Sequence, residues 1–147
     1  MKAKEFLERA YRQKLRVESI QMQVELIRSS AEQTGSIQYG ERVSHTRNVT
    51  AMEDAVIRLM AEEEKLKNAS GTLIRFQAEN AELINTLDDS RQRAVLTRRY
   101  IGFETWERIA ENMHYSTRWV LKQHVIALKK LDQKEEIIDG ILGSNGR

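Results

Sequence analysis

The chain contains no proline and only seven glycines among its 147 residues. Tight turns draw on both residue types and proline interrupts helices, so their scarcity disfavours a turn-rich all-β fold and favours helices. Cysteine is also absent, which excludes disulfides, thiolate catalysis and metal sites that need cysteine. No apolar run approaches the roughly 18 residues of a membrane span, and no signal peptide begins at Met1. We therefore expect an all-α, cytoplasmic protein.

Two stretches, residues 3–31 and 52–87, place apolar residues at alternating steps of three and four, the a/d pattern of coiled-coil helices. Each pattern predicts a long helix with a narrow apolar seam. The first seam consists of Ala3, Phe6, Ala10, Gln13, Val17, Ile20, Val24, Ile27 and Ala31. The second seam consists of Met52, Ala55, Leu59, Glu62, Leu66, Ala69, Leu73, Phe76, Asn80, Leu83 and Leu87.

Neither helix buries its seam alone, so residues 1–90 are expected to form a helical arm. The polar stretch from about residue 33 to 49 is long enough to connect the two helices, which favours a long antiparallel hairpin, similar to a coiled coil. Pairing with another chain, and hence a homo-oligomer through the arm, stays open. We interpret Asn80 as marking a frayed or solvated point of its seam. The alternative is that Asn80 is a polar core residue that sets the register of the two helices.

The last third of the chain predicts three shorter helices at residues 91–101, 104–112 and 116–131, after a polar break at residues 88–90. Gly102 and Phe103 separate the first two. Residues 91–131 are expected to form one domain. The tail of residues 132–147 is expected to end in a frayed segment, residues 143–147. Four apolar residues of the tail are candidates for docking on the body: Ile137, Ile138, Ile141 and Leu142.

Residues 104–131 have the pattern of a helix-turn-helix motif. Ile109 and Ala110 lie on the first helix, and Ser116 is placed to cap the second. The buried face of the second helix is expected to comprise Val120, Ala127, Leu128 and Leu131. Residues 91–131 also carry nine Lys or Arg against three Asp or Glu, a net charge of +6, whereas residues 1–90 have a net charge of −2. The charge alone is equally consistent with a nucleic-acid contact and with a merely solvated helix face. Together with the helix-turn-helix pattern, it favours a nucleic-acid contact.

The second helix, residues 116–130, is expected to enter the major groove of double-stranded DNA as a recognition helix. The predicted DNA-binding residues are Arg99, Thr105, Ser116, Thr117, Arg118, Trp119, Lys122, Gln123 and Lys129. Arg118 has the chemistry for guanine or for a phosphate. Trp119 is either part of an aromatic core, as expected of Trp106 and Tyr115, or a contact to sugar or to a thymine methyl.

Residues 105–131 resemble region 4.2 of the sigma-70 family, the helix-turn-helix that reads the −35 promoter element. The matching residues are Thr105, Glu107, Ile109, Ser116, Val120, Ala127, Leu128, Lys130 and Leu131. Upstream, Val95 to Ile101 resembles the preceding region 4.1 helix, with Arg99 and Tyr100 as its basic–aromatic pair. His114 stands where that family usually has glycine. Gln123 replaces an aliphatic residue, so the recognition helix is expected either to be rotated or to have its buried face supplemented by Val125. Arg118, Leu121 and Lys122 differ from the base-reading residues, so base specificity is not carried over.

The chain as a whole resembles phage-encoded RinA/ArpU-type transcriptional regulators, through Gly40–Val43 (GERV) and Met52–Val56 (MEDAV). That resemblance implies control of phage late or packaging genes. We expect a sequence-specific DNA-binding regulator whose helix-turn-helix docks on promoter DNA while the helical arm contacts RNA polymerase or a second subunit. The alternatives are a phage small terminase subunit or another oligomeric DNA-binding assembly protein, and a helical bundle that does not bind DNA.

Three histidines, at positions 45, 114 and 124, do not have metal-ligand spacing, and Glu62–Glu64 is interpreted as a solvated helix face. The sequence has no glycine-rich phosphate loop, Ser/His/Asp set or HExxH motif. We therefore expect no enzyme activity, catalytic residue, metal site, cofactor or membrane partner.

Overall fold

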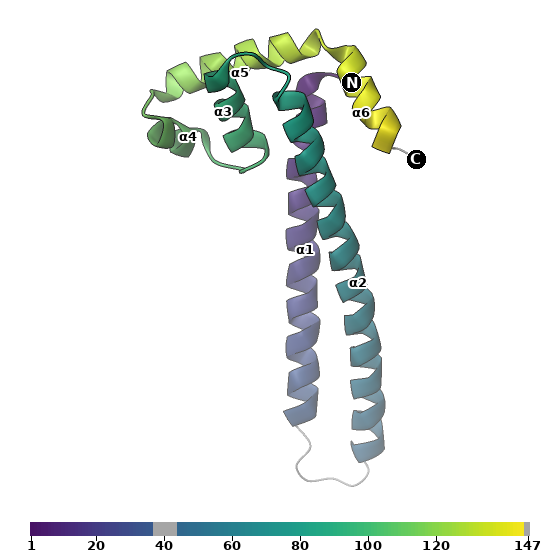
Figure 1. Ribbon diagram of the computed structural model, residues 1–147. Helices are drawn as coiled ribbons and strands as arrows, with labels where there is room; N and C mark the ends of the chain where they lie inside the picture. The colour runs from purple at the N-terminus through teal and green to yellow at the C-terminus, as the bar shows by residue number, and fades with distance from the viewer. Residues whose placement is uncertain (37–43, 146–147) are drawn as a thin grey trace. The chain divides into compact units, whose positions relative to one another are not determined.

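The computed structural model describes residues 1–36 and 44–145, and nearly all of them are helical (Figure 1). The helices are α1 (Ala3–Ser36), α2 (Ser44–Ile84), α3 (Ser90–Tyr100), α4 (Trp106–Met113), α5 (Thr117–Asp132) and α6 (Glu135–Asn145). No strand occurs within the described ranges, which confirms the predicted all-α class and its long N-terminal helix.

The chain divides into two compact units. The head unit combines Met1–Gln13 with the chain from Leu73 onward, and the hairpin unit is Lys14–Thr72. Helices α1 and α2 each contribute to both units. Both ends of the predicted arm, residues 1–13 and 73–90, therefore belong to the head unit.

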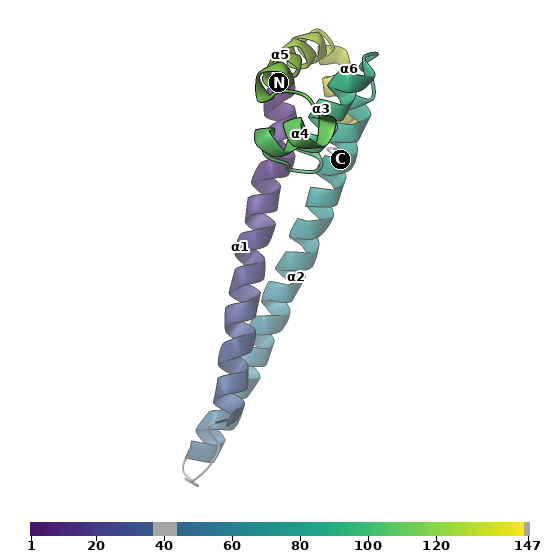
Figure 2. The same ribbon diagram turned by 90° about the vertical axis from the view of Figure 1, so that its left-hand side faces the viewer.

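Both predicted seams are buried or half-buried at every position, which confirms the spacing read from the sequence. In the hairpin unit, α1 and α2 run side by side in both views (Figures 1 and 2), and Arg28 Nη2 bonds Glu63 Oε1 across them at 2.9 Å. Only Val24 and Ala69 in the described part of this unit are fully buried, because a pair of helices covers just one face of each.

Both long helices extend into the stretch predicted to be a polar connection. Helix α1 continues to Ser36 and α2 begins at Ser44, so residues 33–36 and 44–49 are helical. The Ser, Thr and Asn residues there cost only a few tenths of a kcal/mol each, which does not stop a helix that has already nucleated. The Gly40–Val43 segment lies outside the described residues.

The core of the head unit joins residues from both ends of the chain. It contains Ala3, Phe6, Leu7, Leu83, Ile84, Leu87, Leu96, Tyr100, Ala127, Leu131, Ile138 and Ile141. At the edge of this core the Ala3 N–H donates to Asp132 Oδ1 at 2.8 Å. The first turns of α1 and the end of α2 therefore pack with α3, α5 and α6 around one shared core.

Asn80 is fully buried, contrary to the expected solvated point on the seam. Its Nδ2 donates to the Leu7 carbonyl at 3.0 Å and to the Tyr100 carbonyl at 3.3 Å, while its Oδ1 is buried without a protein partner. A buried amide that bonds the backbone of two helices favours one register, because a shift of α1 would break its bond to the Leu7 carbonyl at a place without solvent.

In the tail, residues 135–145 form α6, so the helix includes the first three residues of the segment expected to be frayed. Ile138 and Ile141 are buried in the head core and Leu142 packs against it, which confirms the docking expected of them, whereas Ile137 is 38% exposed. The Lys134 ammonium donates to the Thr86 carbonyl just before α6. Burial of apolar side chains at one-turn spacing stabilises a helix too short to persist alone.

Candidate nucleic-acid interface

Side-chain caps define the starts of α3, α4 and α5 in the head unit. Asp89 accepts hydrogen bonds from the Arg91 and Gln92 N–H groups, and the bond from Gln92 is the main reason that the pKa of Asp89 is lowered. The Thr105 hydroxyl accepts from the Arg108 N–H at 3.2 Å, and the Ser116 hydroxyl accepts from the Trp119 N–H at 3.1 Å. These caps satisfy N–H groups that the helices leave free, so α4 and α5 begin at defined points.

Helix α4 ends at His114, which has left-handed backbone angles (φ 60°, ψ 39°). Its N–H bonds the carbonyls of Ala110 and Glu111, and the Tyr115 N–H bonds the Ala110 carbonyl at 3.1 Å. Histidine therefore holds the turn conformation for which glycine is preferred, as predicted from its position. The turn from His114 to Ser116 sets the direction in which α5 leaves α4.

A second apolar cluster locks the two helices together beside α3. It consists of Val95, Ile109, Ala110 and Val120, with Trp106, Met113 and Trp119 packed against it. The small side chain of Ala110 lets α5 approach α4 closely. The predicted apolar residues of this crossing are thus brought together, and they fix which face of α5 points outward.

The outward face of α5 is basic. Val120, His124, Ala127 and Leu131 are the buried residues of this helix, and they recur at steps of four, three and four. The same steps starting from Arg118 give Lys122, Val125 and Lys129, which are exposed on the opposite side of the helix. Leu121 is exposed beside them. We define the α5 stripe as Arg118, Leu121, Lys122, Val125 and Lys129.

Within the α5 stripe, Arg118, Lys122 and Lys129 supply three positive charges, and Leu121 and Val125 are 40% and 49% exposed. No Asp or Glu occurs from Thr117 to Leu131. The exposure of Val125 corrects the expectation that it supplements the buried face. His124, one residue earlier, takes that place.

Trp119 lies at the edge of this surface, half-buried and stacked on Tyr115, with ring centroids 3.7 Å apart and planes inclined by 13°. The Arg91 guanidinium lies 5.8 Å from the Tyr115 ring centroid. Tyr115 is 38% exposed, so it is not the core residue that the sequence predicted, whereas Trp106 does pack against the core. Thr117 is half-buried at the first position of α5.

Two of the predicted DNA-binding residues lie away from the α5 stripe. Gln123 is half-buried, and its Oε1 accepts a hydrogen bond from Gln92 Nε2 at 3.1 Å, which ties α5 to α3. Arg99 donates to the Glu104 carbonyl at 3.0 Å and lies over the Trp106 ring, 4.4 Å from its centroid. Thr105 and Ser116 act as the caps described above, so their hydroxyls already have a structural role.

Tyr100 and His124 form a buried pair that the sequence did not single out. The Tyr100 hydroxyl and His124 Nε2 share a hydrogen bond of 2.6 Å. Burial is the main cause that lowers the pKa of His124 to about 4, and burial raises the pKa of Tyr100 to about 12. Both groups are therefore neutral near pH 7. The position of His124 four residues after Val120 and three before Ala127 is the signal that predicts its burial.

The described residues contain no group of three or more His, Cys, Asp or Glu side chains placed to hold a metal ion. In the same part of the chain, no helix has the length and apolar character needed to cross a membrane.

Comparison with known proteins gives one family. Neither the curated proteins nor the solved structures include a significant match. The model of a protein family of unknown function, DUF1492, matches residues 36–132, which is 97 of the 147 residues and reaches from the end of α1 through α5. The chain therefore belongs to the DUF1492 family.

Proposed function

We propose that the protein is a sequence-specific DNA-binding transcriptional regulator in which α4, the turn and α5 act as a helix-turn-helix. The observation that carries this proposal is the α5 stripe, with three basic side chains on the face opposite the buried residues of the helix. A helix anchored along one side and basic along the other is suited to the major groove. Arg118 and Lys122, near the N-terminal end, are proposed to reach base edges, and Lys129 a phosphate.

The charge of the surrounding chain supports the same assignment. Residues 91–131 have a net charge of +6, and a duplex presents closely spaced phosphates that such a surface attracts over several ångströms. Trp119 and Tyr115 add an exposed aromatic edge beside the α5 stripe. Amphipathic aromatic rings at that position are suited to sugar and thymine-methyl contacts.

The resemblance of residues 105–131 to sigma-70 region 4.2, and of the whole chain to RinA/ArpU-type regulators, supports a role in phage late or packaging gene control. In this proposal the head unit contacts promoter DNA and the protein also contacts RNA polymerase. The residues proposed to contact DNA are Thr117, Arg118, Trp119, Lys122 and Lys129. Arg99 and Gln123 are not among them, because both form hydrogen bonds within the head unit.

Footprinting of the full-length protein on the DNA that flanks its own coding region tests this function directly. The recovered duplex then serves for anisotropy titrations of Arg118→Ala, Lys122→Ala and Lys129→Ala across a range of salt concentrations. Loss of a base-reading side chain should reduce the binding free energy by about 1–3 kcal/mol. Loss of a phosphate contact should reduce the slope of the logarithm of the binding constant against the logarithm of the salt concentration by about one.

Lys67→Ala is the matched control, because Lys67 is an exposed lysine of α2 in the hairpin unit and the substitution removes the same charge. Its affinity is expected to equal that of the unmodified protein. If all three α5 variants bind as tightly as Lys67→Ala, the assignment of α5 as the recognition helix is wrong. Binding that does not weaken as the salt concentration rises would rule out phosphate contacts.

A second candidate function, an oligomeric DNA-binding assembly protein such as a phage small terminase subunit, is favoured by apolar side chains on the outside of the hairpin unit. The exposed large apolar residues there are Leu15, Met22, Leu26, Val49, Val56, Ile57 and Met60. On α1 they recur at steps of seven and four, a second stripe that a further helix pair would cover.

Light scattering with the full-length protein separates the two candidates. A homodimer, with its two recognition helices on two half-sites, is expected for a regulator, and a closed ring of many copies for an assembly protein. Ile57→Ser and Met60→Ser should weaken either assembly, since each replaces an exposed apolar side chain of α2 by a hydroxyl group. Glu64→Ser, an exposed change on the same helix, is the control.

A further inference from the structure

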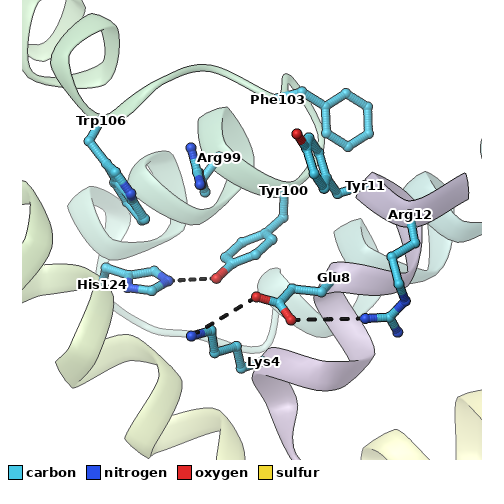
Figure 3. Close-up of a pocket in the computed structure, with 9 residues that line it drawn as sticks. All are labelled: Lys4, Glu8, Tyr11, Arg12, Arg99, Tyr100, Phe103, Trp106 and His124. Atoms are coloured by element: carbon cyan, nitrogen blue, oxygen red, sulfur yellow. Dashed lines mark hydrogen bonds and ion pairs between the residues drawn. The ribbon is translucent and has the colours of Figure 1, made fainter. Parts of the chain in front are cut away.

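A cavity of about 380 Å³ opens in the head unit, on the buried side of α5 (Figure 3). Helix α1 contributes Lys4, Glu8, Tyr11 and Arg12, and His124 of α5 lies on the opposite wall. The remaining lining comes from the end of α3, the following loop and the start of α4. Cavities of roughly this size hold small molecules in many proteins. Because His124 belongs to the buried face of α5, this cavity and the α5 stripe are on different sides of that helix.

Aromatic rings form most of the apolar wall of the cavity. The Tyr100 ring centroid lies 5.7 Å from that of His124, and the Trp106 ring meets His124 edge-on at 4.6 Å. Tyr11 and Phe103 lie beside each other on another part of the lining, with their ring centroids 6.3 Å apart (Figure 3). Phe103, three residues after the end of α3, has a positive backbone φ of 55°. Such walls favour a flat, aromatic ligand.

The charged groups around the cavity have a positive balance. Three cationic residues, Lys4, Arg12 and Arg99, line the cavity together with a single carboxylate, Glu8. The Glu8 oxygens lie 4.0 Å from Lys4 Nζ and 4.0 Å from Arg12 Nη1. These two ion pairs are long and largely exposed, so they hold the cations weakly. The excess of two positive charges favours an anion.

Two further observations connect the charges of Lys4, Glu8 and Arg99 with the aromatic lining of the cavity. Besides burial, the positive charges of Lys4 and Arg99 lower the pKa of His124, and the negative charge of Glu8 raises that of Tyr100. Arg99 lies over Trp106, so a cation and an aromatic face are presented together. A ligand with a ring beside an acidic group satisfies both at once.

We propose that this cavity binds a small aromatic anion, with a planar ring among Tyr11, Tyr100 and Trp106 and a carboxylate or phosphate group on Arg99 and Lys4. The proposal assigns Arg99 to this cavity rather than to DNA. It requires neither DNA binding nor self-association, and it extends the proposed function by a ligand site that contacts the recognition helix from behind.

The test uses the full-length protein with Trp119→Phe, which leaves Trp106 as its single tryptophan. Its fluorescence is followed during titration with adenosine monophosphate and, separately, with indole-3-carboxylate, which distinguish a phosphate from a carboxylate. Adenosine and inorganic phosphate are the matched probes that carry only the ring or only the anion. We expect a saturable change with at least one aromatic anion, and binding at least tenfold weaker for adenosine and for phosphate.

Lys4→Gln and Arg99→Gln are expected to weaken that binding at least fivefold while the circular dichroism spectrum is retained. Arg98→Gln is the control, because Arg98 pairs with Glu104 and does not line the cavity. Lys4 is 63% exposed at its side chain, so its variant should fold even if Arg99→Gln does not.

The proposal is overturned if neither aromatic anion gives a saturable change, or if adenosine monophosphate is the anion that binds and phosphate alone binds as tightly. It is also overturned if Lys4→Gln binds like Arg98→Gln. Because no DNA is present in these titrations, their failure and a failure of DNA binding are read separately.

Discussion

Arg9 and Glu79 form an ion pair inside the head unit, with 2.6 Å between Arg9 Nη2 and Glu79 Oε2. Their side chains are only 14% and 5% exposed. The guanidinium also lies over the rings of Phe6 and Phe76, at 4.1 and 4.5 Å from their centroids. The pair joins the second turn of α1 to the last turns of α2, at a place where little water is available to replace a lost partner.

Glu79→Met should lower the free energy of unfolding by about 3–5 kcal/mol, because it leaves the Arg9 charge buried and unpaired. Arg9→Met should cost less, since Arg75 Nε lies 3.8 Å from the other Glu79 oxygen. The double variant should recover part of the loss, because two apolar side chains replace two buried charges. Urea unfolding measures all three.

Arg28→Met is the control for this series, because Arg28 and Glu63 form a pair with side chains 52% and 46% exposed. A loss below about 1 kcal/mol is expected there. Equal losses for Glu79→Met and Arg28→Met would contradict the role given to the buried pair.

The stability of the head unit should fall as the pH is lowered from about 6.5 towards 4. The pKa of His124 is about 4 in the folded protein against 6.5 ordinarily, so the unfolded chain takes up a proton first in that interval. The stability that the neutral, buried His124 contributes is fully present above pH 6.5 and amounts to at most about 3 kcal/mol of unfolding free energy. Thermal unfolding between pH 7.5 and 4.5 measures it.

His124→Gln should flatten this pH dependence, because glutamine retains a hydrogen-bonding group for Tyr100 but takes up no proton. His114→Asn is the control, since asparagine tolerates the left-handed turn and His114 is exposed. A slope that persists unchanged in His124→Gln would assign the acid sensitivity to other groups.

Ile138→Ala should destabilise the protein by about 2–5 kcal/mol, because its side chain is completely buried in the head core. Ile137→Ala removes the same atoms from a residue that is 38% exposed, and we expect a much smaller loss. The two midpoints of chemical unfolding are to be compared directly. Similar midpoints would mean that α6 does not pack on the core.

At His114, glycine should raise the stability by less than about 1 kcal/mol, and valine should lower it by about 1–2 kcal/mol. The backbone there is left-handed, which glycine adopts freely and a β-branched residue resists, although glycine also gains entropy in the unfolded chain. Differential scanning calorimetry of the two variants checks the order. Valine at or above the stability of glycine would show that the turn is not constrained.

The heptad spacing predicted which residues of the two long helices face each other, and all the seam positions are at least half-buried. It did not predict Leu7 and Ile84, which are buried beside the seam positions Phe6 and Leu83. The spacing describes the contact between two helices only. Leu7 and Ile84 are covered in the common core with α3, α5 and α6, a layer that no local pattern records.

The same limit explains the other differences. Asn80 appeared to be an interruption because the hydrogen-bond acceptors that make its burial favourable belong to Leu7 and Tyr100, far away in the sequence. The caps at Asp89 and Ser116 and the left-handed His114 were predictable because they depend on neighbours within a few residues. For the candidate interface, helical spacing predicted the exposure of Arg118 and Lys122, whereas the contact between Gln123 and Gln92 arises only when α3 packs on α5.

The bond between Ala3 and Asp132 spans 129 positions of the chain, and the core beside it extends to Ile141. A ribosome makes residues 3–10 long before it makes Asp132 and Ile141, so the head unit closes only after those late partners have been made. Both helices of the hairpin unit emerge well before that point. A chain stopped by a premature termination codon before residue 132 would thus carry its paired helices but expose Phe6, Leu7 and Leu83, the kind of apolar surface that chaperones and proteases recognise.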